Sequence, residues 1–412
     1  MAGISMAEAG TAEAEEPMGQ ASELPRWRRW LIIAFLLTGA VKTTMVFTTV
    51  VPVLPLISDH FSGSGDDVLN AQILVTIGPV GIAVSGIIAG WIVSQGRLRL
   101  TLFLSLGMCC LTGLAQLVID NFYLLLLNRF FLGLAAGSSD VAITSIMAAQ
   151  FSGKMRSRLI GFRQAIGSAG TVGTMLLAGW LADHFGWRAP SWMFLFPLTT
   201  LFIAMIAFDR PIEVIKRAVA TERFSLLQLW PIFLFVMIMT AAHTMPSFQI
   251  PFLLRENGIT SAVLISRVPA LSAFISILTA MAFGFVYNVT GRGTLVISAT
   301  AMGIGFIGIS MATTYEMILF WIVIEGIGAG LTTPFFLARL LDRVNAEQRS
   351  TAIGFKMTAM FLGHFINPLV VAPLRHNFGI HGAFSIIGGV MVIGASLFLV
   401  RIILTRHKET IL

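Results

Sequence analysis

The sequence predicts an all-α polytopic membrane protein with twelve transmembrane helices arranged as two six-helix halves. Charged residues make up only 11% of the 412 residues, less than half of the ~25% found in soluble domains. Hydrophobic residues make up 56%, and they occur in blocks of about 20, the length at which a helix crosses a bilayer. A sequence repeat between the two halves is the third observation. So few charges could not cover a soluble protein of this length, and we therefore expect lipid to surround most of the chain.

The apolar blocks between polar breaks predict where each helix lies. A ~30 Å hydrocarbon layer needs about 20 helical residues, and the blocks reach or approach this length. Trp27 and Trp30 beside three arginines are typical of the interface at which a first helix enters the membrane. The predicted spans are residues 30–56, 69–93, 101–119, 122–148, 161–182, 190–209, 226–254, 263–287, 294–312, 317–338, 351–373 and 382–403.

The longest charged break between predicted spans, Asp209–Arg223, separates the two halves. It holds four basic and three acidic residues around Pro211. The first apolar block is too long for the apolar part of a secretory signal, so we expect no cleaved leader. The predicted divisions are a disordered cytoplasmic tail (1–25), an N-terminal six-helix half (26–209), a cytoplasmic central loop (210–225), a C-terminal six-helix half (226–405) and a cytoplasmic tail (406–412).

The basic residues predict the orientation of the helices. Because the number of spans is even, both termini lie on one side of the membrane. If that side is the cytoplasm, 21 of the 27 lysines and arginines belong to cytoplasmic segments and four to outer segments, while Lys42 and Arg129 lie inside helices. Basic residues concentrate on the cytoplasmic side of membrane proteins. We therefore expect cytoplasmic termini and a cell membrane location, with a bacterial inner membrane favoured.

Two segments 193 residues apart relate the halves. Residues 156–163 read RSRLIGFR and residues 349–356 read RSTAIGFK, with five identical positions and a basic residue at the last position of each. The same offset carries two glycines of the fourth predicted helix, Gly133 and Gly137, onto glycines of the tenth. Two similar halves of one orientation predict a parallel repeat about an axis along the membrane normal. A site between such halves opens to either side when one half rocks against the other.

Several motifs carry a resemblance to a known family. The loop after the second span reads GWIVSQGRLRL from Gly90, and its repeat reads GFVYNVTGRG from Gly284. Both resemble the G-x-x-x-D-[RK]-x-G-[RK]-[RK] motif of the major facilitator superfamily. NRFFLGLAAG in the fourth span, which contains Arg129, matches that family's R-x-x-x-G-x-x-x-G pattern, and GWLADHFGWR at the end of the fifth span is another recurrent family segment. The resemblance extends over residues 26–405 and implies the major facilitator fold.

The two loop motifs depart from the family pattern at its acidic position. Ser94 stands where the family has Asp, and Asn288 stands at the equivalent position of the second loop. In the family this Asp belongs to a network on the cytoplasmic face that holds the outward-open state, and a neutral side chain lacks charge assistance. We expect either a weaker latch or a tight glycine turn flanked by arginines. The candidate gating residues are Gly90, Ser94, Gly96, Arg97, Gly284, Asn288 and Arg292.

Four ionisable side chains lie deep inside predicted spans, where a charge is costly and marks a candidate functional residue. Lys42 lies at the middle of the first span and Glu325 near the middle of the tenth. Arg129 and Asp140 share one stripe of the fourth helix, because eleven residues at ~100° each leave them about 20° apart. Arg129 has a gating or coupling role or a structural one. Asp140 either carries protons or neutralises a cation, for which Lys42 and Arg129 are the candidates.

Other polar side chains of the spans are candidates for substrate contacts. Arg163 and Lys356 hold matched positions in the fifth and eleventh helices, and they either draw in anions or extend to the cytoplasmic headgroups. His243, Gln249 and Asn367 could offer hydrogen bonds to a substrate, although helical histidines commonly bond only within the protein.

The sequence excludes several function classes. The two cysteines are adjacent, so they provide neither a disulfide framework nor a CxxC metal site. No GxxxxGK[ST] loop indicates ATP binding, and the basic residues are too scattered for a nucleic-acid surface. The sequence contains no nucleophile with a nearby base that would indicate an enzyme. We expect no metal and no cofactor.

These observations predict a monomeric secondary active transporter of a small organic solute. Protons are the expected coupling ion, because no Na⁺ site is recognisable and Asp140 and Glu325 can titrate. The tenth and eleventh helices resemble those of drug:proton antiporters, which favours efflux. Lys42 and the basic residues of the fifth and eleventh helices indicate instead a symporter or exchanger of organic anions that bear carboxylate or phosphate. A non-transporting sensor or scaffold on the same fold is the alternative of another class.

Overall fold

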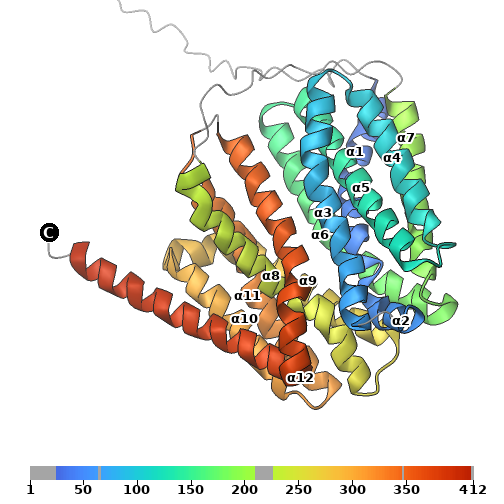
Figure 1. Ribbon diagram of the computed structural model, residues 1–412. Coiled ribbons are helices and arrows are strands. Elements are labelled where there is room, and N and C mark those ends of the chain that lie inside the picture. Colours follow the sequence, from blue (N-terminus) through green and yellow to red (C-terminus); the bar gives the residue numbers. More distant parts are fainter. Residues whose placement is uncertain (1–24, 64–65, 209–225, 346–347, 410–412) are drawn as a thin grey trace, which may run out of the picture.

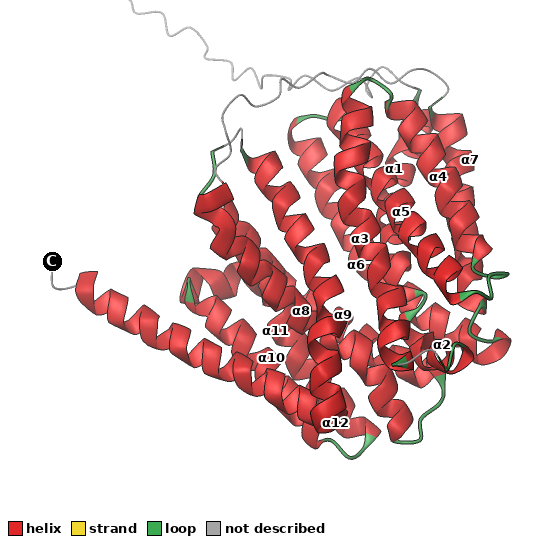
Figure 2. Ribbon diagram, in the orientation of Figure 1, coloured by secondary structure: helices red, strands yellow, loops and turns green. Residues whose placement is uncertain are grey.

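A computed structural model of the chain describes residues 25–63, 66–208, 226–345 and 348–409. Every regular element within these ranges is helical (Figure 2). Residues 1–24 of the predicted tail and the whole predicted central loop lie outside the described residues, as do residues 410–412.

The first spans of the chain form the N-terminal half, which we define as α1 to α7. The first span bends after α1 because Pro52 and Pro55 remove backbone donors there, and it continues through two short helices. The elements of this half are α1 (Arg26–Thr48), η2 (Val51–Val53), α2 (Leu54–His60), α3 (Asp67–Ser94), α4 (Leu98–Ala115), α5 (Phe122–Gln150), α6 (Gly153–Phe185), η3 (Ala189–Phe194) and α7 (Leu195–Ala207).

The remaining helices form the C-terminal half: α8 (Leu226–Glu256), α9 (Ala262–Thr290), α10 (Gly293–Met311), α11 (Tyr315–Leu341) and α12 (Arg349–Glu409). In the described residues, eleven helical segments are long and apolar enough to cross a membrane. The last of them is broken at Gly379, whose φ of 71° is open to glycine but strained for other residues. The chain turns there, between the two last predicted spans (Figure 1). The predicted all-α polytopic fold is therefore confirmed.

Side-chain caps fix where several helices begin. Asn121 accepts a hydrogen bond from the backbone N–H of Leu124 at the start of α5, and Thr314 accepts one from Met317 at the start of α11. Such caps satisfy backbone donors that have no partner inside the helix. The two capping residues are 193 positions apart, so the repeat extends to the local signals that start its helices.

Glycines let equivalent helix pairs approach closely in both halves. A Cβ atom on Gly133 of α5 would lie 1.9 Å from the carbonyl oxygen of Gly78 on α3. The repeat-related Gly326 of α11 meets α9 in the same way, where a Cβ would lie 3.0 Å from the carbonyl oxygen of Ser272. Small residues at such crossings are the usual means by which helices associate in lipid. The glycine stripe of the fourth predicted span therefore lies against a closely packed neighbouring helix.

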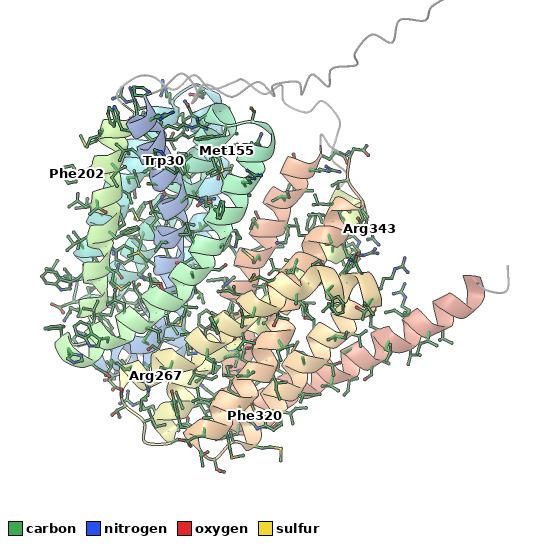
Figure 3. All side chains as sticks on the ribbon, turned by 180° about the vertical axis from the view of Figure 1, so that it is seen from behind. Trp30, Met155, Phe202, Arg267, Phe320 and Arg343 are labelled. Atoms are coloured by element: carbon green, nitrogen blue, oxygen red, sulfur yellow. The ribbon has the colours of Figure 1, made fainter. Side chains whose placement is uncertain are left out.

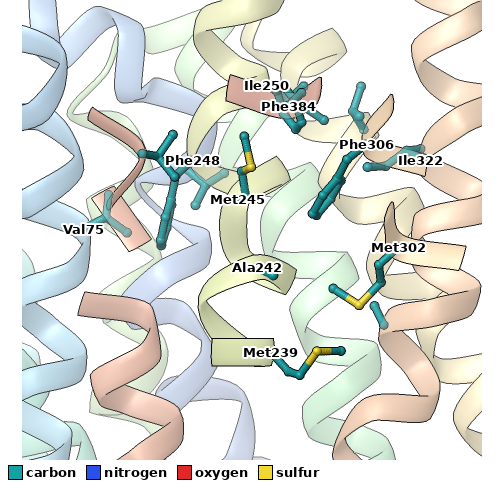
Figure 4. Close-up of a cluster of buried hydrophobic side chains, with 14 of the residues drawn as sticks. Val75, Met239, Ala242, Met245, Phe248, Ile250, Met302, Phe306, Ile322 and Phe384 are labelled. Carbon is teal, nitrogen blue, oxygen red and sulfur yellow. The ribbon is translucent and has the colours of Figure 1, made fainter. Parts of the chain in front are cut away.

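A buried apolar cluster extends from the C-terminal half into the N-terminal half. Met245 and Phe248 of α8 and Phe306 of α10 are its large members, and Val75 of α3 joins it from the other half (Figure 4). On the outside of the bundle, apolar side chains such as Phe202 are exposed, and Figure 3 shows this residue pointing outward. Lipid-facing apolar residues around a mixed interior are what a bilayer solvent requires.

The two halves converge on one side of the membrane. We call the side where α1 begins the amino-terminal side and the side where α2 ends the opposite side. From the opposite side the halves lean apart toward the amino-terminal side (Figures 1 and 3). At the opposite side Arg255 pairs with Asp59, and Arg375 pairs with Asp66 at 2.8 Å. Each pair joins an acid of the N-terminal half to an arginine of the C-terminal half.

A third acid of the N-terminal half completes the contacts at the opposite side. The carboxylate of Asp183, near the end of α6, accepts hydrogen bonds from Ser261 Oγ and the backbone N–H groups of Ala262 (both 2.6 Å) and Val263 (3.1 Å). A carboxylate of one half therefore caps the first helix turn of α9 in the other half. Gly179 permits this approach, because a Cβ there would lie 2.4 Å from Ser266 Oγ of α9.

Candidate functional site

The N-terminal half contains a cluster of charged side chains from three helices. Arg163 of α6 donates a short hydrogen bond to Asp140 of α5 and forms an ion pair with it. Thr43 of α1 donates to the same Asp140 oxygen at 3.4 Å. Asp140 and Arg163 each lie ten residues, or about 15 Å, from the helix end at the amino-terminal side. The pair is deep in the span, and Asp140 is 36% exposed.

Lys42 of α1 is the third charge of this cluster. Its side chain is fully buried, and Nζ has no hydrogen-bond partner among the described residues. The carboxylate of Asp140 and the guanidinium of Arg163 are near enough for their charges to act on it. A buried ammonium without a partner is costly unless a ligand, water or carboxylate satisfies its three donors. Arg163 Nε is also buried without a partner, so the cluster holds two unsatisfied donor groups.

The prediction that Lys42 or Arg129 is the cation beside Asp140 is wrong for Arg129 and incomplete for Lys42. Arg163, expected to face anions or the headgroups, is the direct partner of Asp140. Arg129 is fully buried and donates instead to Gln116 Oε1 at 3.1 Å and to the backbone oxygens of Val46 and Leu74. Two residues on one helix stripe can be separated by several turns, so a shared face does not make them partners.

The C-terminal half contains a second cluster, centred on Glu325 of α11. Its carboxylate is fully buried. Ser272 of α9 donates to Oε2 at 2.6 Å, and His243 Nδ1 of α8 lies 3.4 Å from Oε1. The His243 side chain is 41% exposed, whereas that of Glu325 is 0% exposed. The histidine is therefore the accessible member of this pair and the carboxylate the enclosed one.

His364 of α12 lies beside this second cluster and against the other half. Its ring centroid is 5.1 Å from that of Phe47 on α1, and it lies near His243. Nδ1 lies 2.8 Å from the carbonyl oxygen of Met360. Because a carbonyl only accepts, Nδ1 donates, and Nε2 of the neutral ring is left as an acceptor.

The remaining polar candidates are placed apart from the two clusters. Gln249 Nε2 lies 3.4 Å from Gln72 Oε1 of the other half, and Asn367 donates to the carbonyl oxygen of Ala241 at 2.6 Å. The side-chain oxygens of Gln249 and Asn367 are buried without partners in the described residues. Lys356 is buried on α12, and it forms no part of either cluster.

The candidate gating loops are exposed turns at the amino-terminal side. Ser94 donates to the carbonyl oxygen of Trp91 on its own helix at 2.7 Å. Gly96 has a φ of 84° and lies between α3 and α4, where the chain needs glycine to reverse. Arg97 precedes α4. The remaining members of the set, Gly90, Gly284, Asn288 and Arg292, lie at the ends of α3 and α9 and at the turn that follows α9.

Sequence reasoning missed the polar side chains that hold the candidates in place. Ser272, Thr43 and Gln72 carry no charge, and serines and threonines are common throughout these helices. The signal that could have indicated them is indirect, because a buried carboxylate or amide requires a donor nearby. In the described residues, no group of three or more His, Cys, Asp or Glu is arranged to hold a metal ion.

A family model described as Major Facilitator Superfamily matches residues 32–294 and 232–411. The chain belongs to the major facilitator superfamily. The predicted family resemblance is therefore confirmed, and the chain is a multi-pass membrane transporter of small solutes.

Relatives of this superfamily member are described as transporters. It is 24% identical over 400 residues to the multidrug resistance protein MdtG of Klebsiella pneumoniae, covering 92% of this chain and 94% of that protein. It is 33% identical over 134 residues to the cis,cis-muconate transport protein of Acinetobacter baylyi, covering 32% of each. The chain thus matches only about a third of the length of the muconate protein.

Solved structures of transporters share the fold of this superfamily member. A nucleoside transporter, NupG, superimposes with a TM-score of 0.73 at 12% identity, covering 90% of this chain and 98% of that one. A D-xylose–proton symporter superimposes with a TM-score of 0.70 at 15% identity, covering 89% and 95%. The named relatives and structures are transporters and not enzymes.

Proposed function

We propose that the chain is a proton-coupled secondary transporter of a small organic anion that carries a carboxylate. The observation that carries this proposal is the buried Nζ atom of Lys42, which has no hydrogen-bond partner among the described residues. The pairing of Asp140 with Arg163 leaves the N-terminal cluster with one excess positive charge. A substrate carboxylate would supply both the missing negative charge and the missing acceptors.

Arg163 gives the proposed site a second donor. One nitrogen of its guanidinium is occupied by Asp140, while the buried Nε atom is free of partners in the described residues. Protonation of Asp140 would release more of this guanidinium toward a carboxylate. The muconate transport protein, which is named for a dicarboxylate, supports this substrate class through the third of the chain that it matches.

Efflux of amphiphilic compounds is the second candidate function. It is supported by the match over 94% of the multidrug resistance protein MdtG.

We further propose that both termini lie in the cytoplasm of a bacterium and that the chain acts as a monomer in the inner membrane. Residues 26–209 and 226–405 then rock as two bodies about the central loop. In this orientation the amino-terminal side is the cytoplasmic side.

The test is transport by the full chain in proteoliposomes, with cis,cis-muconate as the anion and a neutral amphiphilic dye as the comparison. We expect Lys42→Gln to abolish muconate exchange and Lys42→Arg to retain part of it, because the arginine keeps the charge at the site. Arg343→Gln, which removes an exposed positive charge, is the control. Equal loss of both substrates in Lys42→Gln would make Lys42 structural, and unchanged muconate exchange would refute the proposed anion site.

A further inference from the structure

The Glu325 cluster differs from the Lys42 cluster in charge and depth. Glu325 and Ser272 each lie ten residues, about 15 Å, from the helix end at the opposite side. Asp140 and Arg163 lie the same distance from the amino-terminal side. The Glu325 cluster has an acid and histidines, whereas the Lys42 cluster has two cations and one acid. The two clusters therefore suit different ligands and lie at different depths in the bundle.

All four helices around Glu325 contribute to its surroundings. α8 supplies His243, and α9 supplies the hydroxyl of Ser272. α10 supplies only backbone at the closest approach, where a Cβ on Gly305 would lie 2.9 Å from that of Glu325. α12 supplies His364, which lies near His243. Histidines are thus the titratable groups that these helices place near the carboxylate in the described part of the chain.

One proton shared between Glu325 and His243 would leave this pair with no net charge. The pair is neutral overall either as carboxylate and imidazolium or as carboxylic acid and imidazole. In a buried site a net charge is costly, so the geometry suits a pair that exchanges one proton without becoming charged overall. Ser272 fixes the position of the carboxylate, because its hydroxyl donates to Oε2 at 2.6 Å.

We propose that His243, Glu325 and Ser272 form the proton-binding site of the transport cycle, separate from the anion site in the other half. His243, the exposed member, passes the proton between the accessible space and the enclosed Glu325 carboxylate. Ser272 is a positioning residue that holds the carboxylate toward α9. The assignment rests on the proposed function for the coupling ion, but not on the identity of the substrate.

Infrared difference spectra between acid and alkaline samples of the purified full chain test the site without any substrate. We expect a protonated-carboxyl signal in the wild type that disappears in Glu325→Gln and shifts in His243→Gln. Glu316→Gln, an exposed acid at the start of the same helix, is the matched control and should leave the signal unchanged. Persistence of the signal in Glu325→Gln would overturn the assignment.

Transport in proteoliposomes tests the separation of the two sites. We expect Glu325→Gln to lose accumulation driven by a pH gradient, together with substrate-dependent proton flux, while muconate exchange at equal pH survives. Lys42→Gln should lose exchange while keeping the carboxyl signal, so failure of the anion proposal and failure of the proton site give different results. Ser272→Ala should change the pH dependence of accumulation and leave muconate exchange at equal pH intact, because the carboxylate loses the donor that positions it. Proton flux that survives in both Glu325→Gln and His243→Gln would refute the proposal.

Discussion

Arg129 shows how one side chain can join several helices of a membrane protein. It is fully buried, and its planar guanidinium donates to backbone oxygens of α1 and α3 and to a glutamine that follows α4. Hydrogen bonds from charged groups to fixed acceptors contribute more than neutral ones. The described contacts of Arg129 therefore favour a structural role within the N-terminal half.

Substitution of Arg129 should lower stability more than it changes substrate preference. We expect Arg129→Lys to cost roughly 2–3 kcal/mol, the value of a hydrogen bond to a charged group, because lysine cannot reach three separate acceptors. The free energy of unfolding in detergent and the substrate concentration for half-maximal transport are the two measurements. Arg343→Lys at an exposed position is the control. If Arg129→Lys keeps the wild-type free energy of unfolding but changes substrate selectivity, Arg129 belongs to the substrate site and the structural role is wrong.

Helix pairs α3–α5 and α9–α11 depend on glycine at their crossings. Gly133→Ala would place a Cβ 1.9 Å from a backbone oxygen of α3, which cannot move like a flexible side chain. Gly107 of α4 has no atom within 4 Å of such a Cβ, so Gly107→Ala is the matched control. We expect Gly133→Ala to lower the melting temperature and yield, and Gly107→Ala to be neutral or to stabilise its helix by up to ~1 kcal/mol. Equal melting temperatures would mean that the helices can separate at no cost.

The features predicted well from sequence are those that repeat along a single helix. Spans, glycine stripes and the related halves depend on local composition and on spacing, which the chain order records directly. The partner of Asp140 could not be predicted in the same way, because helical periodicity gives the face of a residue and not the helix that meets it. Ser272 was missed for the same reason. Its contact with Glu325 joins residues 53 positions apart through a neutral hydroxyl.

At the scale of the whole molecule, contacts between the halves close the opposite side. Acids of the N-terminal half pair with arginines of the C-terminal half or accept hydrogen bonds at the start of α9. Asp183→Ala removes three hydrogen bonds to α9. We expect it to shift the population toward a state open at that side by ~1–3 kcal/mol, the usual size of a conformational coupling. Labelling of Ser58→Cys, a buried position on α2, by a membrane-impermeant reagent should therefore accelerate.

The control for this prediction is Asp120→Ala. Asp120 is an acid on the same side, but it pairs with Arg188 of its own half, so its loss should leave the labelling rate unchanged. If Asp183→Ala labels no faster than Asp120→Ala, the carboxylate cap on α9 does not help to close this side.

The cap that Asp183 places on α9 also makes this helix end a built-in reporter of the transport cycle. The backbone N–H groups of Ala262 and Val263 receive their acceptor from the other half, and amides in a first helix turn have no acceptor within their own helix. Whenever the halves separate at this side, these two N–H groups would lose that acceptor and become exposed to water. Deuterium uptake at these two amides should therefore follow the fraction of time that the protein spends open there, without any label or substitution.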